Sequence, residues 1–140
     1  MNLYLDTEFN GHGGPLISMA LAADDGQHWY QVLPEPIVWD TWCLEHVRPR
    51  LLKHFVDKEF FCYSLKAYLS ARSGCTIYAD WPDDFSHLMR VMSGDTYASS
   101  WMIACNMTLL KESDPKPEIP HNALSDAIAL MEWHRARLAK

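Results

Sequence analysis

The heptapeptide LYLDTEF, residues 3–9, sets the first element of the fold, because it is short, apolar and aromatic and ends at Asn10-Gly11. This composition predicts a β-strand that begins almost at the first residue. Two further apolar runs follow at residues 16–22 and 28–33, with Asp25-Gly26 between them. An Asp-Gly pair between two apolar runs is a strong signal for a β-hairpin. The opening third of the chain is therefore predicted to form a three-stranded antiparallel meander.

The rest of the chain changes to helical spacing with one more strand. Helical spacing starts at Asp40 and must end or kink at Pro49, and a second helix is expected from a cap at Ser64. Residues 75–79 are typical of a buried strand, and Asp83 or Asp84 is expected to open the next helix. Residues 94–120 give no clear element, although they contain the apolar run Trp101-Met102-Ile103 and a proline-rich loop.

The last element is a helix that Asn122 can cap. Its expected apolar stripe consists of Leu124, Ile128, Met131, Arg135 and Leu138. A meander followed by helix, strand and helix predicts an α/β fold with helices packed against a central mixed sheet.

Composition limits the kind of protein. A chain of 140 residues is one ordinary domain, so residues 1–140 are expected to form a single unit. The net charge of −6 disfavours a broad basic surface for long nucleic acid, but it leaves room for a short end in a local pocket. No apolar run reaches the length of a membrane span and no secretory leader opens the chain, so a cytoplasmic protein is expected. The four cysteines form no Cys-x-x-Cys pair, which disfavours structural zinc.

Asp6 and Glu8 are the first candidates for chemistry. Side chains two residues apart on a strand point to the same face, so the two carboxylates are expected to lie together. Two such charges on a buried strand repel each other, and a hard divalent cation such as Mg²⁺ would resolve this repulsion. The alternative is a solvated strand end.

His121 and Asp126 are the second pair of candidates. If Asn122 caps the last helix, His121 lies in the preceding loop and Asp126 one turn inside the helix. The helix would then hold Asp126 rigidly, as suits a metal ligand, while the loop lets His121 move, as suits a proton acceptor. The alternative is an acid that is favoured at this place by the helix dipole alone.

A third cluster lies between the fourth predicted strand and the next helix. Asp80, Asp83 and Asp84 bring negative charge to this junction. One of Asp83 and Asp84 has an alternative explanation as an N-cap.

The order of these motifs resembles the DEDDh family of 3′–5′ exonucleases, which includes RNase T, oligoribonuclease and polymerase proofreading domains. The resemblance rests on LYLDTEF, the acidic junction in the middle of the chain, and HNALSDA at residues 121–127. It implies a ribonuclease H-like fold, with Asp6, Glu8 and Asp126 as metal ligands and His121 as the catalytic base.

The same resemblance implies a middle acid, for which two positions remain open. Asp84 is preferred, because the family commonly has an apolar residue four positions later and Leu88 stands there. Asp80 is the alternative, although many members carry asparagine at its position.

The resemblance further implies two Mg²⁺ or Mn²⁺ ions and release of 5′-mononucleotides from the 3′ end of short or single-stranded nucleic acid, with exoribonuclease activity expected first. A DNA-directed exonuclease and a catalytically silent module that binds nucleic acid or protein are the alternatives. Phe9, Trp81 and Phe85 are candidates for base stacking, with core packing as the alternative. Several members of the family are dimers, and the candidate interface aromatics in this chain are Trp39, Trp42 and Trp101.

Overall fold

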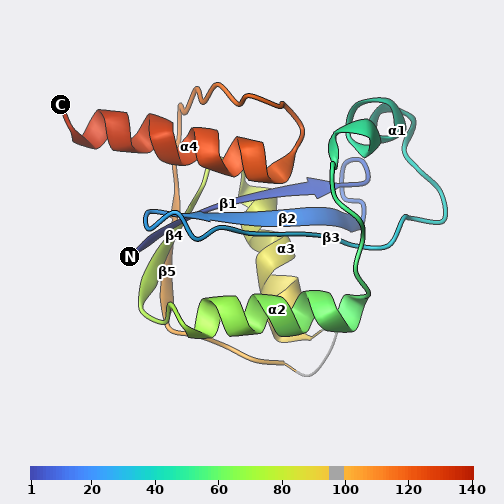
Figure 1. Cartoon of the computed structure of the whole chain (residues 1–140), viewed down its shortest axis with the longest axis horizontal. Coiled ribbons are helices and arrows are strands. Elements are labelled where there is room, and N and C mark those ends of the chain that lie inside the picture. Colours follow the sequence, from blue (N-terminus) through green and yellow to red (C-terminus); the bar gives the residue numbers. More distant parts are fainter. Residues whose placement is uncertain (95–99) are drawn as a thin grey trace.

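The computed structural model describes residues 1–94 and 100–140. Within them the chain forms a five-stranded mixed sheet with helices on both faces, so the predicted α/β class is confirmed (Figure 1). The strands are β1 (Asn2–Phe9), β2 (Leu16–Ala23), β3 (Trp29–Val32), β4 (Cys75–Ala79) and β5 (Cys105–Leu109). The helices are α1 (Thr41–His46), the 3₁₀ helix η1 (Arg48–Arg50), α2 (Lys58–Ser70), α3 (Pro82–Ser93) and α4 (Ala123–Leu138).

The sheet has the strand order β3-β2-β1-β4-β5, so β1 is its central strand. β1, β2 and β3 pair antiparallel, which confirms the predicted meander. β4 and β5 are added in parallel to β1. The pairing of β1 with β4 covers only Asn2 to Tyr4, so the carboxyl half of β1 extends beyond the end of β4. This overhang is where Asp6 and Glu8 lie.

Helices cover the two faces of the sheet unequally. α4 lies on one face, and α2 lies on the other (Figure 1). Leu3 and Leu5 of β1 pack with residues of α2 and α3, whereas Tyr4 packs with α4. Because side chains alternate along a strand, Asp6 and Glu8 share the face of Tyr4 and therefore point toward α4.

The contact between α4 and the sheet is made of small side chains. Ala123 and Ala127 of α4 pack in the same buried cluster as Ala20 and Ala22 of β2. The predicted apolar stripe is therefore wrong in part: Met131 is buried, but Leu138 is 68% exposed. Alanines on both sides let the helix approach the sheet closely, which places the first turn of α4 over the overhang of β1.

This close contact gives a stability prediction. Ala127→Leu is expected to destabilise the fold by about 1–3 kcal/mol, since added methylene groups in a packed interior force the neighbours apart. Ala127 is 0% exposed, whereas Ala136 on the same helix is exposed. Ala136→Leu is therefore the matched control, and its unfolding free energy should change by less than about 0.5 kcal/mol. Equal denaturation midpoints for the two variants would contradict the packing described here.

Two helix starts differ from the predictions. α2 begins after Asp57, whose carboxylate accepts a hydrogen bond from the backbone N–H of Phe60, and not at Ser64. Ser64 lies inside the helix, where its hydroxyl accepts from Nε1 of Trp29. α3 begins with Pro82, a residue favoured in the first turn because it has no N–H to leave unpaired. The neighbouring acids therefore lie within the first turn and do not cap the helix.

β5 is the element that the sequence did not predict. It lies after the apolar run at 101–103 and not on it, and Trp101 is buried in the core. Its signal in the sequence is a weak alternation of buried and exposed residues: Cys105 and Met107 pack against the core while Asn106 is exposed. None of the helices described at residues 1–94 and 100–140 combines the length and apolarity needed to cross a membrane.

Candidate metal centre

The candidate site lies at the carboxyl ends of the parallel strands. β1 overhangs β4 there, and the amino-terminal turns of α3 and α4 approach the overhang from opposite sides of the sheet. In open α/β sheets this edge is the usual place for ligands, because neighbouring strands and their connections diverge and leave a crevice. A cleft of about 620 Å³ opens at this position. Its lining residues are Asp6, Thr7, Glu8, Phe9, Gly11, His12, Asp40, Trp42, Cys43, Trp81, Asp83, Asp84, His121 and Asp126.

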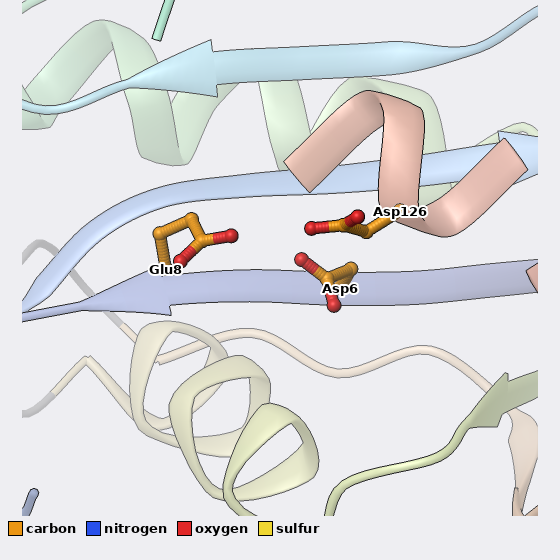
Figure 2. Close-up of side chains that lie close together, drawn as sticks. All are labelled: Asp6, Glu8 and Asp126. Carbon is orange, nitrogen blue, oxygen red and sulfur yellow. The ribbon is translucent and has the colours of Figure 1, made fainter. Parts of the chain in front are cut away.

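Asp6, Glu8 and Asp126 form the first group of carboxylates. One oxygen of each lies within 4.8 Å of the others. Figure 2 shows Asp6 and Glu8 rising from β1 toward Asp126, which descends from the first turn of α4. The backbone N–H of His121 donates to Oδ2 of Asp126 at 3.1 Å and holds that carboxylate in place.

Asp6, Asp80 and Asp84 form the second group, again with one oxygen of each within 4.8 Å of the others. Asp6 therefore belongs to both groups. Asp84 is 2% exposed, and its Oδ1 accepts hydrogen bonds from the backbone N–H of Thr7 at 3.1 Å and from Oγ1 of Thr7 at 2.6 Å. The N–H of Thr7 is free for this role because β4 ends before it.

Two oxygens of this cluster are buried without a partner. Oδ2 of Asp6 and Oδ2 of Asp84 accept no hydrogen bond from any residue in the described parts of the chain. A buried charged oxygen without a donor costs free energy, so native proteins pair such atoms with hydrogen-bond donors or with metal ions. The absence of a partner for both oxygens among the described residues favours the binding of an additional positive group by the cluster.

The electrostatic cost of the cluster appears in its pKa values. Burial, followed by the charges of Asp84 and Glu8, raises the pKa of Asp6 well above its ordinary value. Burial and the charge of Asp126 raise the pKa of Glu8 to about 8. Burial raises the pKa of Asp84 to about 7 although hydrogen bonds from Thr7 oppose the shift, and it raises the pKa of Asp126 to about 6. The four carboxylates cannot all be ionised near neutral pH without a compensating cation.

The residues present fit a divalent cation. Their donor atoms are all carboxylate oxygens, which hard ions such as Mg²⁺ and Mn²⁺ prefer over softer metals. Asp6 and Asp84 each keep one buried oxygen without a hydrogen-bond partner in the described residues. The cluster therefore combines negative charge, oxygen ligands and unpaired carboxylate oxygens in one place.

His121 stands at the rim of this cleft. Its backbone is left-handed, with φ of 66°, immediately before Asn122, whose side chain caps α4 by accepting from the N–H of Ser125 at 3.0 Å. Burial, together with the charges of Arg50 and His46, lowers the pKa of the His121 imidazole. The imidazole is consequently neutral near pH 7 and is able to accept a proton.

The candidate aromatic residues divide between the cleft and the core. Trp81, 57% exposed, and Phe9 both line the cleft, whereas Phe85 packs against the core. Trp42, a candidate for a dimer interface, lines the cleft, with its ring edge-on to His121 at a centroid separation of 4.9 Å. Trp101 is buried and therefore cannot serve as an exposed interface aromatic.

The structure thus brings Asp6, Glu8, Asp84, His121 and Asp126 to one cleft, and Asp80 lies beside Asp84. Sequence reasoning missed Thr7, which anchors Asp84, because its role depends on where β4 stops. No protein-family model matches the chain, and a search of curated proteins returns no match. The chemistry of the site is therefore inferred from its geometry and from the motif order in the sequence.

Proposed function

We propose that this protein is a metal-dependent 3′–5′ exonuclease of the DEDDh type with a ribonuclease H-like fold. The observation that carries the proposal is the convergence of Asp6, Glu8, Asp84 and Asp126, drawn from three separate segments, beside a neutral histidine. The strand order β3-β2-β1-β4-β5, with an antiparallel meander and two parallel strands, supports the fold assignment. Hydrolysis would release 5′-mononucleotides from single-stranded RNA or DNA, with RNA preferred.

The carboxylates and the histidine have separate tasks in this reaction. Divalent cations held by Asp6, Glu8, Asp84 and Asp126 would supply Lewis-acid polarisation of the scissile phosphate and acidify the attacking water. His121 takes the proton from that water, since its neutral imidazole stands at the rim of the same cleft. The hydrogen bond from the backbone N–H of His121 to Asp126 couples the position of the base to that of the acid.

The shape and charge of the protein favour a short or single-stranded end as substrate. The net charge is −6, so the chain carries no excess of basic side chains to follow a long duplex. The cleft is about 620 Å³ and is lined by the exposed ring of Trp81 and by Phe9. Aromatic surfaces of this kind stack on unpaired bases without reading their sequence.

Substitution of the base gives a prediction for this mechanism. His121→Gln is expected to lower kcat by about 10²-fold or more, because a positioned general base contributes that amount. KM should change little, since the imidazole acts on the water. Single-turnover hydrolysis of a labelled oligonucleotide at saturating Mn²⁺ measures the effect. His12→Gln, at another histidine of the cleft, provides a comparison, and an equal loss in both variants would contradict a specific role for His121.

The proposed activity is tested by digesting RNA and DNA oligonucleotides of graded length. A 5′-labelled strand should shorten one nucleotide at a time, and a 3′-labelled strand should release labelled mononucleotide in the first turnover. EDTA should stop both reactions, and a circular strand of the same sequence should resist digestion. Internal fragments from the circle would indicate an endonuclease, whereas binding without any shortening would indicate a silent module. The comparison of RNA with DNA decides the preferred substrate.

A further inference from the structure

Asp80 is a carboxylate that the proposed mechanism does not use. We propose that Asp80 completes a second cation position with Asp6 and Asp84, so that the centre binds two divalent cations before any nucleic acid arrives. This inference rests on the proposed function, because it assumes that the acidic cluster is a metal centre. It replaces the choice between Asp80 and Asp84 with a joint role for both residues.

The first support is the place of Asp80 in the fold. Asp80 directly follows Ala79, the last residue of β4, and therefore lies at the same edge of the sheet as the overhang of β1. The backbone N–H of Leu110, just after β5, donates to the carbonyl of Ala79 at 2.8 Å. β4 and β5 thus end together beside the overhang of β1, and the backbone that carries Asp80 is fixed by its neighbour.

The second support is the hydrogen bond that orients Asp80. Oγ of Ser113, in the segment after β5, donates to Oδ2 of Asp80 at 3.0 Å. One carboxylate oxygen of Asp80 still lies within 4.8 Å of oxygens of Asp6 and Asp84. A partner that holds a ligand from the outside is a common feature of metal centres, since it reduces the ordering cost when the ion binds.

The third support is that Asp6 and Asp84 each have a buried carboxylate oxygen without a hydrogen-bond partner in the described part of the chain. Asp84 is 2% exposed, and neither its Oδ2 nor Oδ2 of Asp6 has a hydrogen-bond partner in the described chain. An acidic cluster on an exposed surface would be solvated, but these two oxygens are removed from water. A cation near Asp80 would supply the positive partner that these two buried oxygens lack at residues 1–94 and 100–140.

The number of ligands decides when that cation binds. Mg²⁺ is commonly held by one or two protein carboxylates together with substrate phosphates. Asp6 and Asp84 alone would form such a position, which fills only with substrate present. Asp80 adds a third carboxylate and one more negative charge, so the position no longer depends on the phosphate. The group of Asp6, Glu8 and Asp126 likewise has three carboxylates.

The test is the stoichiometry of Mn²⁺ binding without nucleic acid. Isothermal titration calorimetry, with electron paramagnetic resonance to count free Mn²⁺, should find two bound ions per parent chain. Asp80→Asn should retain one ion and weaken the other by at least ~10-fold, as expected when a ligand or its immediate support is lost. Ser113→Ala should weaken the same ion while retaining the carboxylate, and it serves as the second variant if Asp80→Asn does not fold.

Asp83→Asn is the matched control. Asp83 lies in the same first turn of α3 as Asp84, but its Oδ2 accepts from Nε1 of Trp81 at 3.3 Å and it belongs to neither group. It should bind two ions like the parent. Asp80→Asn that binds two ions with parental affinity would overturn the inference, as would a parent chain that binds fewer than two.

These outcomes are separable from failure of the proposed function. If two ions bind, Asp80→Asn loses one, and no oligonucleotide is shortened, the inference holds and the exonuclease proposal fails. If the parent hydrolyses oligonucleotides but binds its second ion only with nucleic acid present, the exonuclease proposal holds and the inference fails.

Discussion

Replacing Asp6 with asparagine is expected to lower the rate of phosphodiester hydrolysis by at least ~10³-fold and to raise the melting temperature of the metal-free protein. The loss of rate follows because Asp6 belongs to both carboxylate groups, and an active-site metal contributes several kcal/mol to transition-state stabilisation. The gain in stability follows because the amide carries no charge. Near pH 8 the folded chain no longer has to bury or protonate that carboxylate.

The two effects are measured by single-turnover hydrolysis in Mn²⁺ and by thermal unfolding in EDTA. An increase of about 2–5 °C in the melting temperature corresponds to roughly 1 kcal/mol of unfolding free energy for a domain of this size. Asp114→Asn is the control, because Asp114 is an exposed partner of Lys116 and belongs to neither carboxylate group, and it should change neither quantity. Parental turnover in Asp6→Asn would defeat the proposed function. A lower melting temperature would show that Asp6 stabilises the fold in the absence of metal.

The stability of the metal-free protein is expected to fall as the pH rises from about 5 to about 8.5. In the folded chain Glu8 keeps its proton up to a pKa of about 8, and Asp84 up to about 7. The unfolded chain releases these protons near the ordinary values of 4.5 and 3.8. Between those limits the folded state binds more protons than the unfolded state, so raising the pH favours unfolding. The stabilisation is complete below about pH 4 and is lost through the folded pKa values.

Each pKa unit of difference is worth about 1.4 kcal/mol, so the melting temperature in EDTA should fall by at least ~5 °C over this window. Saturating Mg²⁺ near pH 8 should restore it, because an ion at 100 times its dissociation constant adds about 2.7 kcal/mol. Asp6→Asn should show a shallower pH dependence, since one of the interacting charges is gone. A melting temperature that stays constant or rises with pH in EDTA would contradict a cluster of buried acids with raised pKa values.

Local patterns predicted the parts of this molecule that depend on neighbours in sequence. The period of two in LYLDTEF placed Asp6 and Glu8 on one face, and the cap at Asn122 placed His121 in the loop and Asp126 in the first turn. Each of these features is decided within a few residues. The meander followed in the same way from the Asp-Gly turn between β2 and β3.

Features that depend on distant parts of the chain were not predictable in this way. β5 has only weak alternation, and it forms because β4 offers a parallel edge to pair with. The anchoring of Asp84 by Thr7 exists because β4 ends before that residue. The buried face of α4 is set by the small side chains of β2 opposite. The spacing of the large apolar residues in α4 therefore predicted a stripe that is wrong in part. The sequence likewise left the choice between Asp80 and Asp84 open, and the fold brings a carboxylate oxygen of each within 4.8 Å of one of Asp6.

For the proposed metal centre, the alanine layer under α4 has a consequence for ion selectivity. Ala20, Ala22 and Ala127 fix the height of the helix above the sheet, and with it the gap that Asp126 must bridge to reach Asp6. Oxygen atoms surround Mg²⁺ at about 2.1 Å and Ca²⁺ at about 2.4 Å, so a spacing of a few tenths of an ångström separates the two ions. In the proposed centre, discrimination between Mg²⁺ and Ca²⁺ would then depend on the packing of these buried alanines, which contact no ion themselves.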